Sequence, residues 1–189
     1  MLVLVGRSCT GKDTIKKILC DKYGMERVVT CTTRPPRNGE IDGVDYYFMK
    51  HFTNTYGLFA ETTEYHVASG ETWYYGSRVQ DYEDSNNKVI VLNPEGLKSV
   101  RDIGLPVFVV EITSPDNLIK GRQMARGDNP AEAARRFDQD VIDFADISKY
   151  TNTCIVNWGD GGPERCARNI YQLYQHWLDK QKGGNNVED

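Results

Sequence analysis

Long apolar runs are absent from this sequence, and no stretch approaches the roughly 18 apolar residues that a membrane-spanning helix needs. The five cysteines form no Cys-x-x-Cys pair and the three histidines lie far apart, so neither a disulfide framework nor a zinc site is indicated. Basic residues are not in excess, because the net charge is −4, which argues against a nucleic-acid partner. No signal-peptide pattern precedes the first apolar run, so we expect a cytoplasmic protein with reduced cysteines.

What the sequence does have is the composition of one globular domain, since its 189 residues are 39% hydrophobic and 26% charged. Apolar, β-branched runs occur at residues 2–5, 27–30, 89–92, 107–112 and 153–157. Helical patterns occur at residues 12–23, 94–102, 115–125, 130–147 and 163–181. This alternation predicts an α/β fold of three layers, in which a five-stranded parallel sheet is flanked by helices.

Two regions interrupt the alternation and predict insertions into this fold. Residues 31–77 have the pattern of a loop and short strands, with a hairpin at residues 68–71, and predict a small antiparallel lobe. Residues 122–147 contain several arginines around a polar turn at residues 126–130, and predict a mobile helical lid. The expected division is a single domain at 1–181, with its core at 1–30, 78–121 and 148–181, and a disordered tail at 182–189.

The most informative motif is Gly-Arg-Ser-Cys-Thr-Gly-Lys-Asp-Thr, which lies between a predicted strand and a predicted helix. Gly6 and Gly11 allow the backbone angles and close approaches that a loop wrapped around a phosphate requires. Lys12 adds a positive charge for the β- and γ-phosphates, and the following helix directs its positive end at the same anion. The motif predicts a nucleotide-binding P-loop. Its expected binding residues are Gly6, Ser8, Thr10, Gly11, Lys12, Asp13 and Thr14.

The residue after the lysine departs from the P-loop pattern. A serine or threonine is expected there to hold Mg²⁺, but this chain has Asp13. A carboxylate beside triphosphate oxygens is repulsive unless a cation lies between them. We therefore expect Asp13 either to contact Mg²⁺, directly or through water, or to turn away from the site.

Four further stretches follow the P-loop. They are Thr-Thr-Arg-Pro-Pro-Arg-Asn-Gly-Glu from Thr32, Tyr-Tyr-Gly-Ser ending at Ser77, Arg122-x-x-x-Arg126-Gly127, and Ile155-Val156-Asn157. In this order they resemble the motifs of the guanylate kinases, and the resemblance covers nearly the whole chain. It implies reversible phosphoryl transfer from ATP to GMP or dGMP, with Mg²⁺ as the cofactor.

The resemblance implies that Arg34 and Arg37 hold the phosphate of the monophosphate. The prolines between them restrict the backbone, so the two guanidinium groups form a rigid double fork that can grip a dianion bidentately. Tyr46 and Tyr75 can donate hydroxyl hydrogen bonds to the same phosphate. The resemblance adds Thr30 to this side of the site.

The resemblance also implies a carboxylate that reads guanine, because N1–H and the 2-amino group of the base are adjacent donors. The family pattern places this carboxylate at Glu61. The chain is longer than the family between Glu61 and Tyr75, so Glu64 is an alternative. Ser77 would address O6 of the base. Asn93 stands where the family has an aspartate, so an acceptor oxygen is kept and a charge is lost.

The implied reaction needs no general base, since the acceptor is a phosphate oxygen that is already ionised. Catalysis then depends on alignment and on neutralising charge. The catalytic residues implied are Lys12, Arg34, Arg122, Arg126 and Arg136. Arg122, Arg126 and Asn157 would also contact ATP, and Thr14 would touch its α-phosphate.

Other functions fit the sequence less well. Kinases of other nucleoside monophosphates share the P-loop and the lid, so turnover of each monophosphate distinguishes them. A catalytically inactive guanylate-kinase-like interaction domain would not require Lys12, Arg34 and Arg37. A P-loop GTPase would carry an Asn-Lys-x-Asp-like run, which the chain lacks. The expected partners are therefore nucleotides, with no membrane partner, and the expected state is a monomer or a homodimer.

Overall fold

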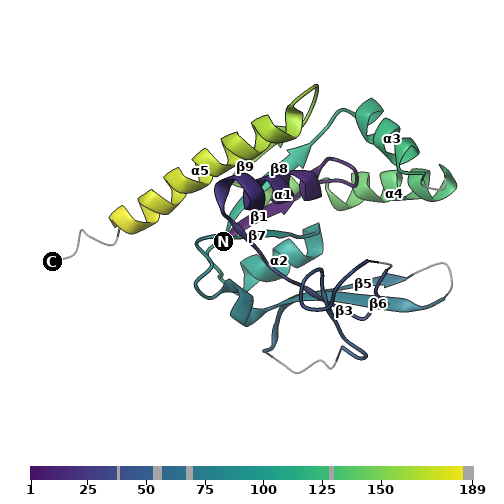
Figure 1. Ribbon diagram of the computed structural model, residues 1–189, viewed down its shortest axis with the longest axis horizontal. Helices are drawn as coiled ribbons and strands as arrows, with labels where there is room; N and C mark the ends of the chain where they lie inside the picture. The colour runs from purple at the N-terminus through teal and green to yellow at the C-terminus, as the bar shows by residue number, and fades with distance from the viewer. Residues whose placement is uncertain (38, 53–56, 67–69, 128–129, 185–189) are drawn as a thin grey trace.

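The main sheet of the computed structural model has five parallel strands in the order β2-β7-β1-β8-β9 (Figure 1). These strands are β1 (Leu2–Val5), β2 (Glu26–Arg27), β7 (Lys88–Val91), β8 (Phe108–Thr113) and β9 (Thr153–Val156). The structure describes residues 1–37, 39–52, 57–66, 70–127 and 130–184. The predicted five-stranded parallel sheet is confirmed.

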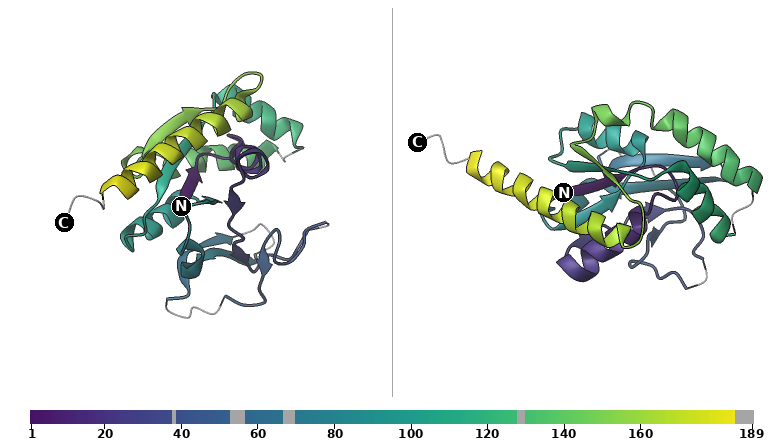
Figure 2. Two further views of the ribbon diagram at one scale, coloured as in Figure 1. Left: turned by 60° about the vertical axis from the view of Figure 1, so that its left-hand side comes forward. Right: turned by 90° about the horizontal axis from the view of Figure 1, so that it is seen from above.

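Helices lie on both faces of this sheet, because its strands are apolar on both sides. Leu2 and Leu4 of β1 contact one core cluster, whereas Val3 and Val5 contact the other, as the twofold period of a strand requires. The helices are α1 (Lys12–Tyr23), α2 (Pro94–Asp102), α3 (Asp116–Ala125), α4 (Pro130–Asp143) and α5 (Gly162–Gly184), with 3₁₀ turns η1 (Val79–Tyr82) and η2 (Ile147–Lys149). Helices α1 and α5 contribute to the first cluster and α2 to the second. They accordingly lie on opposite faces of the sheet (Figure 2).

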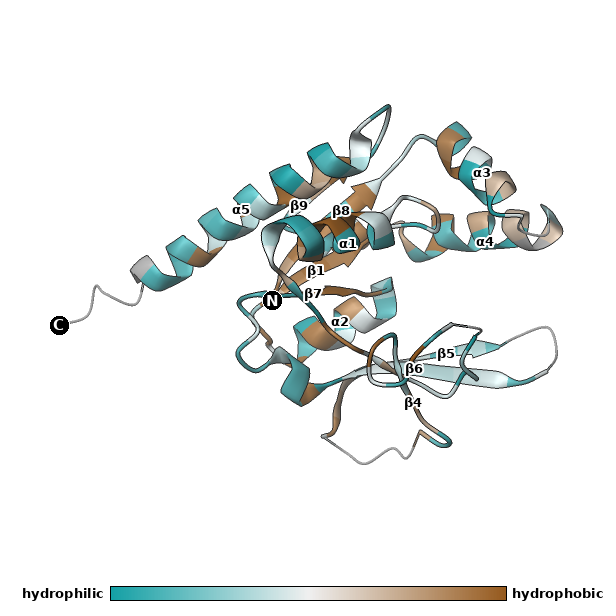
Figure 3. Ribbon diagram, viewed as in Figure 1, coloured by the Kyte–Doolittle hydropathy of each residue, from teal (hydrophilic) through white to brown (hydrophobic). Residues whose placement is uncertain are grey.

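Apolar residues are concentrated in the strands of the main sheet, and the outer surfaces of the helices are mostly hydrophilic (Figure 3). No helix in the described part of the chain has both the length and the apolar content needed to cross a bilayer. The main sheet therefore forms the core, and the loops at its edge are not needed for core packing.

A second sheet of four strands lies beyond α2, in the order β4-β3-β6-β5 (Figure 1). Its strands are β3 (Cys31–Thr32), β4 (Tyr47–Phe48), β5 (Phe59–His66) and β6 (Thr72–Arg78). Strands β5 and β6 are antiparallel, as the predicted hairpin requires, although residues 67–69 of its turn lie outside the described residues. Strands β3 and β4 are parallel, so the lobe is mixed rather than wholly antiparallel. The reason is the long connection between them, which returns the chain in the same direction.

Three elements differ from the predicted bounds by more than one residue. The strand expected at 27–30 is Glu26–Arg27, because after the amide of Val28 donates to the carbonyl of Val89 (3.0 Å) the chain leaves for the second sheet. The helix expected at 130–147 ends at Asp143. Just after it, the backbone amide of Ala145 donates a hydrogen bond to the carbonyl of Ile142, three residues earlier, which tightens the backbone into a 3₁₀ turn.

The third difference is at the C-terminal end of the described chain. Helix α5 continues to Gly184, so residues 182–184 of the expected disordered tail are helical. The helix continues because one of its faces, with Tyr174 and Leu178, packs on the core, and no proline interrupts the following turns. Residues 185–189 lie outside the described residues, as do residues 128 and 129 of the predicted lid turn.

Candidate active site

The P-loop connects β1 to α1 and is shaped by close contacts with neighbouring backbone. Gly6 has a φ of 152°, and a Cβ atom there would lie 2.2 Å from the carbonyl oxygen of Ile112 in β8. Gly11 has a φ of 97°, and a Cβ atom there would lie 2.4 Å from Nδ2 of Asn157. Both positions therefore require glycine, as the motif indicates. Cys9 also has a positive φ, 60°, which is uncommon for a residue with a side chain.

Side chains from the ends of β8 and β9 hold the loop in place. The Nδ2 group of Asn157 donates to the carbonyl of Thr10 (2.8 Å), and the hydroxyl of Ser114 donates to the carbonyl of Asn157 (2.7 Å). The guanidinium of Arg122 on α3 donates to the carbonyl of Cys9 (3.0 Å) and to the Ser114 hydroxyl (3.1 Å). Asn157 and Arg122, both predicted to contact ATP, thus bond to the P-loop itself, whereas Ser114 belongs to no motif.

The lysine of the motif lies against its own loop. The Nζ atom of Lys12 donates to the carbonyls of Gly6 (2.6 Å) and Arg7 (2.8 Å), and burial lowers the pKa of its ammonium group. The amide of Ser8 donates to Oδ2 of Asp140 on α4 (2.6 Å). Asp140 was also missed by the sequence motifs, because 132 residues separate it from Ser8.

Asp13, the departure from the P-loop pattern, is exposed and lies 3.2 Å from the ammonium group of Lys16. Its negative charge acts to raise the pKa values of Lys12 and of the Tyr46 hydroxyl. The described residues contain no cluster of three or more His, Cys, Asp or Glu side chains that could hold a metal ion. A divalent cation at Asp13 would therefore take its other ligands from phosphate oxygens and water, as Mg²⁺ commonly does.

In the second lobe, Arg34 is almost fully buried, and its Nη2 atom donates to both carboxylate oxygens of Glu40, at 2.8 and 2.9 Å. Glu40 also accepts a hydrogen bond from the amide of Arg37 (2.6 Å), and the bond from the Arg34 guanidinium is the main reason that the Glu40 pKa is lowered. The guanidinium carbon of Arg34 lies 5.4 Å from the ring centroid of Tyr46, whose ring meets that of Tyr75 edge-on. Tyr46 and Tyr75 thus lie beside the buried Arg34, and the backbone of Arg37 shares its partner Glu40.

The pairing of β5 with β6 separates the two candidate glutamates. Glu61 pairs with Ser77, and Thr63 pairs with Tyr75, so these four residues share one face of the lobe. Glu64 points to the opposite face and is exposed. Glu61 is only 8% exposed, and burial raises its pKa to about 7 although Ser77 donates hydrogen bonds to it. The geometry favours Glu61 over Glu64.

Helix α2 closes the space behind Glu61. The Oε2 atom of Glu61 lies 2.9 Å from where a Cβ atom on Gly96 would stand, so a side chain at residue 96 would force the carboxylate to shift. Asn93 caps the helix, because its Oδ1 accepts a hydrogen bond from the amide of Gly96 (2.8 Å) while its Nδ2 donates to the hydroxyl of Thr63 (3.2 Å). The acceptor oxygen expected of Asn93 is thus used by α2.

The other predicted residues lie near the P-loop or in the second lobe. Thr14 is exposed on the first turn of α1, and Thr30 is half-buried, with its carbonyl accepting from the amide of Tyr47. Arg126 is exposed at the end of α3, and Arg136 is exposed on α4. These two lid arginines therefore lie on α4 and at the end of α3.

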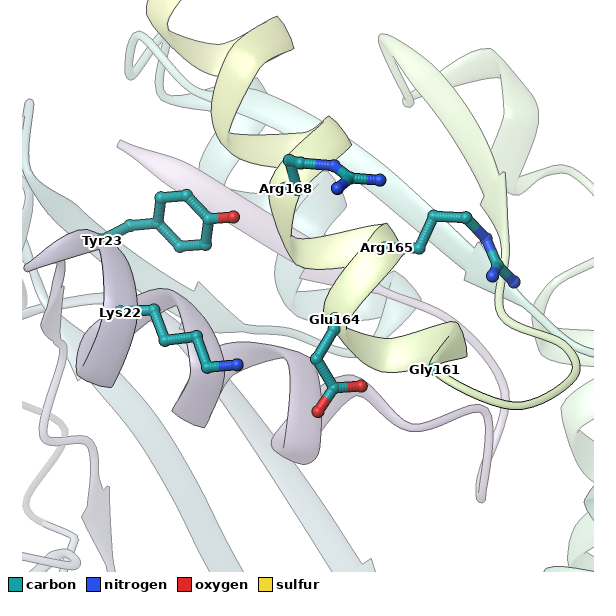
Figure 4. A pocket seen from close by; sticks show the side chains of 6 residues that line it. All are labelled: Lys22, Tyr23, Gly161, Glu164, Arg165 and Arg168. Atoms are coloured by element: carbon teal, nitrogen blue, oxygen red, sulfur yellow. The ribbon is translucent and has the colours of Figure 1, made fainter.

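A pocket away from these residues lies between the last turn of α1 and the start of α5 (Figure 4). Its lining residues are Lys22, Tyr23, Gly161, Glu164, Arg165 and Arg168. Lys22 and Tyr23 end the helix that Lys12 begins, about 15 Å away along its axis. This pocket therefore belongs to neither the P-loop nor the second lobe.

The first strand of the parallel sheet leads through a P-loop lysine into a helix, and the lobe beside it holds a buried arginine and paired tyrosines. Together these features define a nucleotide kinase of the P-loop class. A family model described as guanylate kinase matches residues 1–156 of the chain. The chain belongs to the guanylate kinase family, and it is therefore a nucleoside monophosphate kinase.

Individual relatives agree with this assignment. The guanylate kinase of Symbiobacterium thermophilum is 32% identical over 150 residues, covering 72% of this chain and 67% of the relative. That of Bifidobacterium longum is 29% identical over 172 residues, covering 83% and 85%. A crystal structure of guanylate kinase from Anaplasma phagocytophilum has the same fold, with a TM-score of 0.62 and 20% identity over 93% of this chain and 84% of that one.

Proposed function

We propose that this kinase transfers the γ-phosphoryl group of ATP to GMP or dGMP, giving ADP and GDP or dGDP. The observation that carries the proposal is the buried carboxylate of Glu61, which shares a face of the second lobe with Tyr75 and Ser77. Guanine presents two adjacent donors to such an acceptor, whereas adenine presents no donor at N1. The lobe is therefore suited to guanine.

On the acceptor side, the phosphate of GMP would be bound by Arg34, Arg37, Tyr46 and Tyr75, with Thr30 beside them. Arg34 is held by Glu40, so its fork has a fixed orientation before the nucleotide arrives. Ser77 and Asn93 line the base side, although capping of α2 by Asn93 leaves less of its acceptor capacity for the base.

On the donor side, the P-loop would hold the phosphates of ATP through its amides and Lys12. Lys12 would exchange its bonds to the Gly6 and Arg7 carbonyls for phosphate oxygens. The lid arginines Arg122, Arg126 and Arg136 would neutralise charge on the transferring group. One arginine in this role can accelerate phosphoryl transfer ~10³-fold or more.

Asp13 would contribute to holding Mg²⁺, directly or through water, from its position directly after the P-loop lysine. When bound, the ion supplies charge neutralisation on the phosphate oxygens. The residues of this chain align the two nucleotides and exclude water, so that the acceptor oxygen is in line with the γ-phosphorus.

The decisive assay is ADP production from ATP with GMP, dGMP, AMP, dTMP and CMP, each as the only acceptor. We expect turnover with GMP and dGMP, and exclusive turnover of AMP, dTMP or CMP would contradict the proposal. Glu61→Ala should lower kcat/KM for GMP at least about 100-fold, because a site built to pair with the base is left unpaired. Glu64→Ala is the matched control on the same strand and should leave kcat/KM within about twofold, the ordinary size of an exposed substitution.

The setting of the enzyme is also part of the proposal. We expect a cytoplasmic monomer or homodimer whose partners are nucleotides, with no nucleic-acid or membrane partner. The net charge of −4 and the scattered, reduced cysteines support this view. Light scattering at working concentration measures the oligomeric state.

A further inference from the structure

The acidic side chain of Asp140 touches a P-loop amide. Its Oδ2 atom lies 2.6 Å from the backbone nitrogen of Ser8, which donates a hydrogen bond to it. Amides of a P-loop are the groups that bind phosphate oxygens, and a carboxylate oxygen has the same charge and the same acceptor chemistry. Asp140 therefore uses a donor that a bound triphosphate would need.

Asp140 is half-buried on α4, and a second residue of that helix fastens it to the same loop. Phe137, one turn earlier, lies under the guanidinium of Arg7 at 5.3 Å and the ammonium of Lys120 at 4.9 Å from its ring centroid. Arg7 in turn pairs with Asp116 at the start of α3 (2.6 Å). The contact of Asp140 is thus one point of a packed junction between α4 and the P-loop, rather than a chance approach of an exposed side chain.

The charges around this junction favour the contact only while the loop is empty. Lys12 is close enough for the charge of Asp140 to act on it, and its ammonium is bonded to the carbonyls of Gly6 and Arg7. A triphosphate in the loop would place further negative charge beside the carboxylate, and the Ser8 amide has only one hydrogen to donate. The two acceptors exclude each other at this amide.

We propose that Asp140 is an intramolecular competitor of the phosphates of the donor nucleotide. It holds α4 against the empty P-loop and leaves the Ser8 amide when ATP binds. The inference rests on the proposed binding of ATP at the P-loop. As a consequence, the contact of α4 with the P-loop depends on whether ATP is bound, because ATP replaces the Asp140 carboxylate as the acceptor of the Ser8 amide.

The test is a calorimetric titration of the full chain with ATP, and separately with pyrophosphate, for the wild type, Asp140→Ala and Asp140→Asn. Removing the competitor should tighten both ligands about tenfold, the change expected for one charge-assisted hydrogen bond. Asp140→Asn keeps the size and one acceptor oxygen but not the charge, so it should tighten binding by a smaller factor. GMP affinity should be unchanged in both variants.

Asp143→Asn is the matched control, because Asp143 lies on the exposed side of α4 and accepts a bond from Gln139 rather than from the loop. It should bind ATP as the wild type does. Unchanged or weaker ATP binding in both Asp140 variants, with circular dichroism as in the wild type, would overturn the inference. A wild type that binds no ATP would instead refute the proposed function, so the two failures are distinguishable.

Discussion

Glutamine in place of Glu61 is expected to stabilise the nucleotide-free protein against unfolding at pH 8. The carboxyl group is buried, and burial raises its pKa from 4.5 to about 7. At pH 8 the folded protein therefore holds a buried charge that the unfolded chain exposes to water. The difference of about 2.5 pH units corresponds, at 1.36 kcal/mol per pH unit, to about 3 kcal/mol of unfolding free energy, which a neutral amide recovers.

The stability gain of Glu61→Gln depends on pH, so it has to be measured at two pH values. Because the folded pKa is the higher one, the wild type is not penalised below pH 4.5 and loses stability as the pH rises to about 7. Urea denaturation should thus give Glu61→Gln a gain of about 3 kcal/mol at pH 8 and less than about 1 kcal/mol at pH 5. The same variant should lose affinity for GMP, since an amide cannot accept both guanine donors.

Glu64→Gln is the matched control for this experiment, because Glu64 is exposed on the opposite face of β5. Its stability should not differ from the wild type by more than about 0.5 kcal/mol at either pH. A loss of stability in Glu61→Gln at pH 8 would refute the reasoning. It would mean that the bonds from Ser77 outweigh the burial of the charge.

Three further variants, together with one control variant, test other parts of the site. Arg34→Lys should weaken GMP binding about tenfold or more in calorimetry and leave ATP binding unchanged, because an ammonium group cannot form the bidentate pair. Gly11→Ala should weaken ATP binding and lower the unfolding free energy by about 1–3 kcal/mol. Gly24→Ala isolates the backbone strain in thermal denaturation, since Gly24 has a similar positive φ with no atom near its absent Cβ. Asp13→Ser should raise the Mg²⁺ concentration needed for half-maximal activity, and an unchanged Mg²⁺ dependence would exclude contact between Asp13 and the ion.

Much of the fold could be predicted because the central strands have a strong apolar signal. All four residues of β1 are buried, and such a run between helical patterns has few alternatives to a parallel sheet. Strand β2 gives no such signal, since it consists of Glu26 and Arg27, both exposed. A strand is predicted there because Val28 and Val29 are apolar, whereas pairing with β7 determines where the strand lies.

The candidate site could be predicted as residue types but not as contacts. The motifs identify Lys12 and Arg34, because phosphate binding constrains which residues can serve. The choice between Glu61 and Glu64 needed the strand register, which an irregularity between Phe59 and Glu61 alters. Asp140 could not be found in the sequence, because its partner lies 132 residues away and the contact exists only after α4 packs on the P-loop.

The ion pair between Arg34 and Glu40 has a kinetic consequence. The charge of the buried guanidinium is balanced at 2.8 Å by a carboxylate, so little of its field extends into the solvent. A dianionic nucleotide therefore gains little long-range attraction from this arginine, so replacing Arg34 should change the ionic-strength dependence of the association rate only slightly. Arg34 then acts through its geometry once the nucleotide has arrived, which makes it a determinant of residence time rather than of encounter.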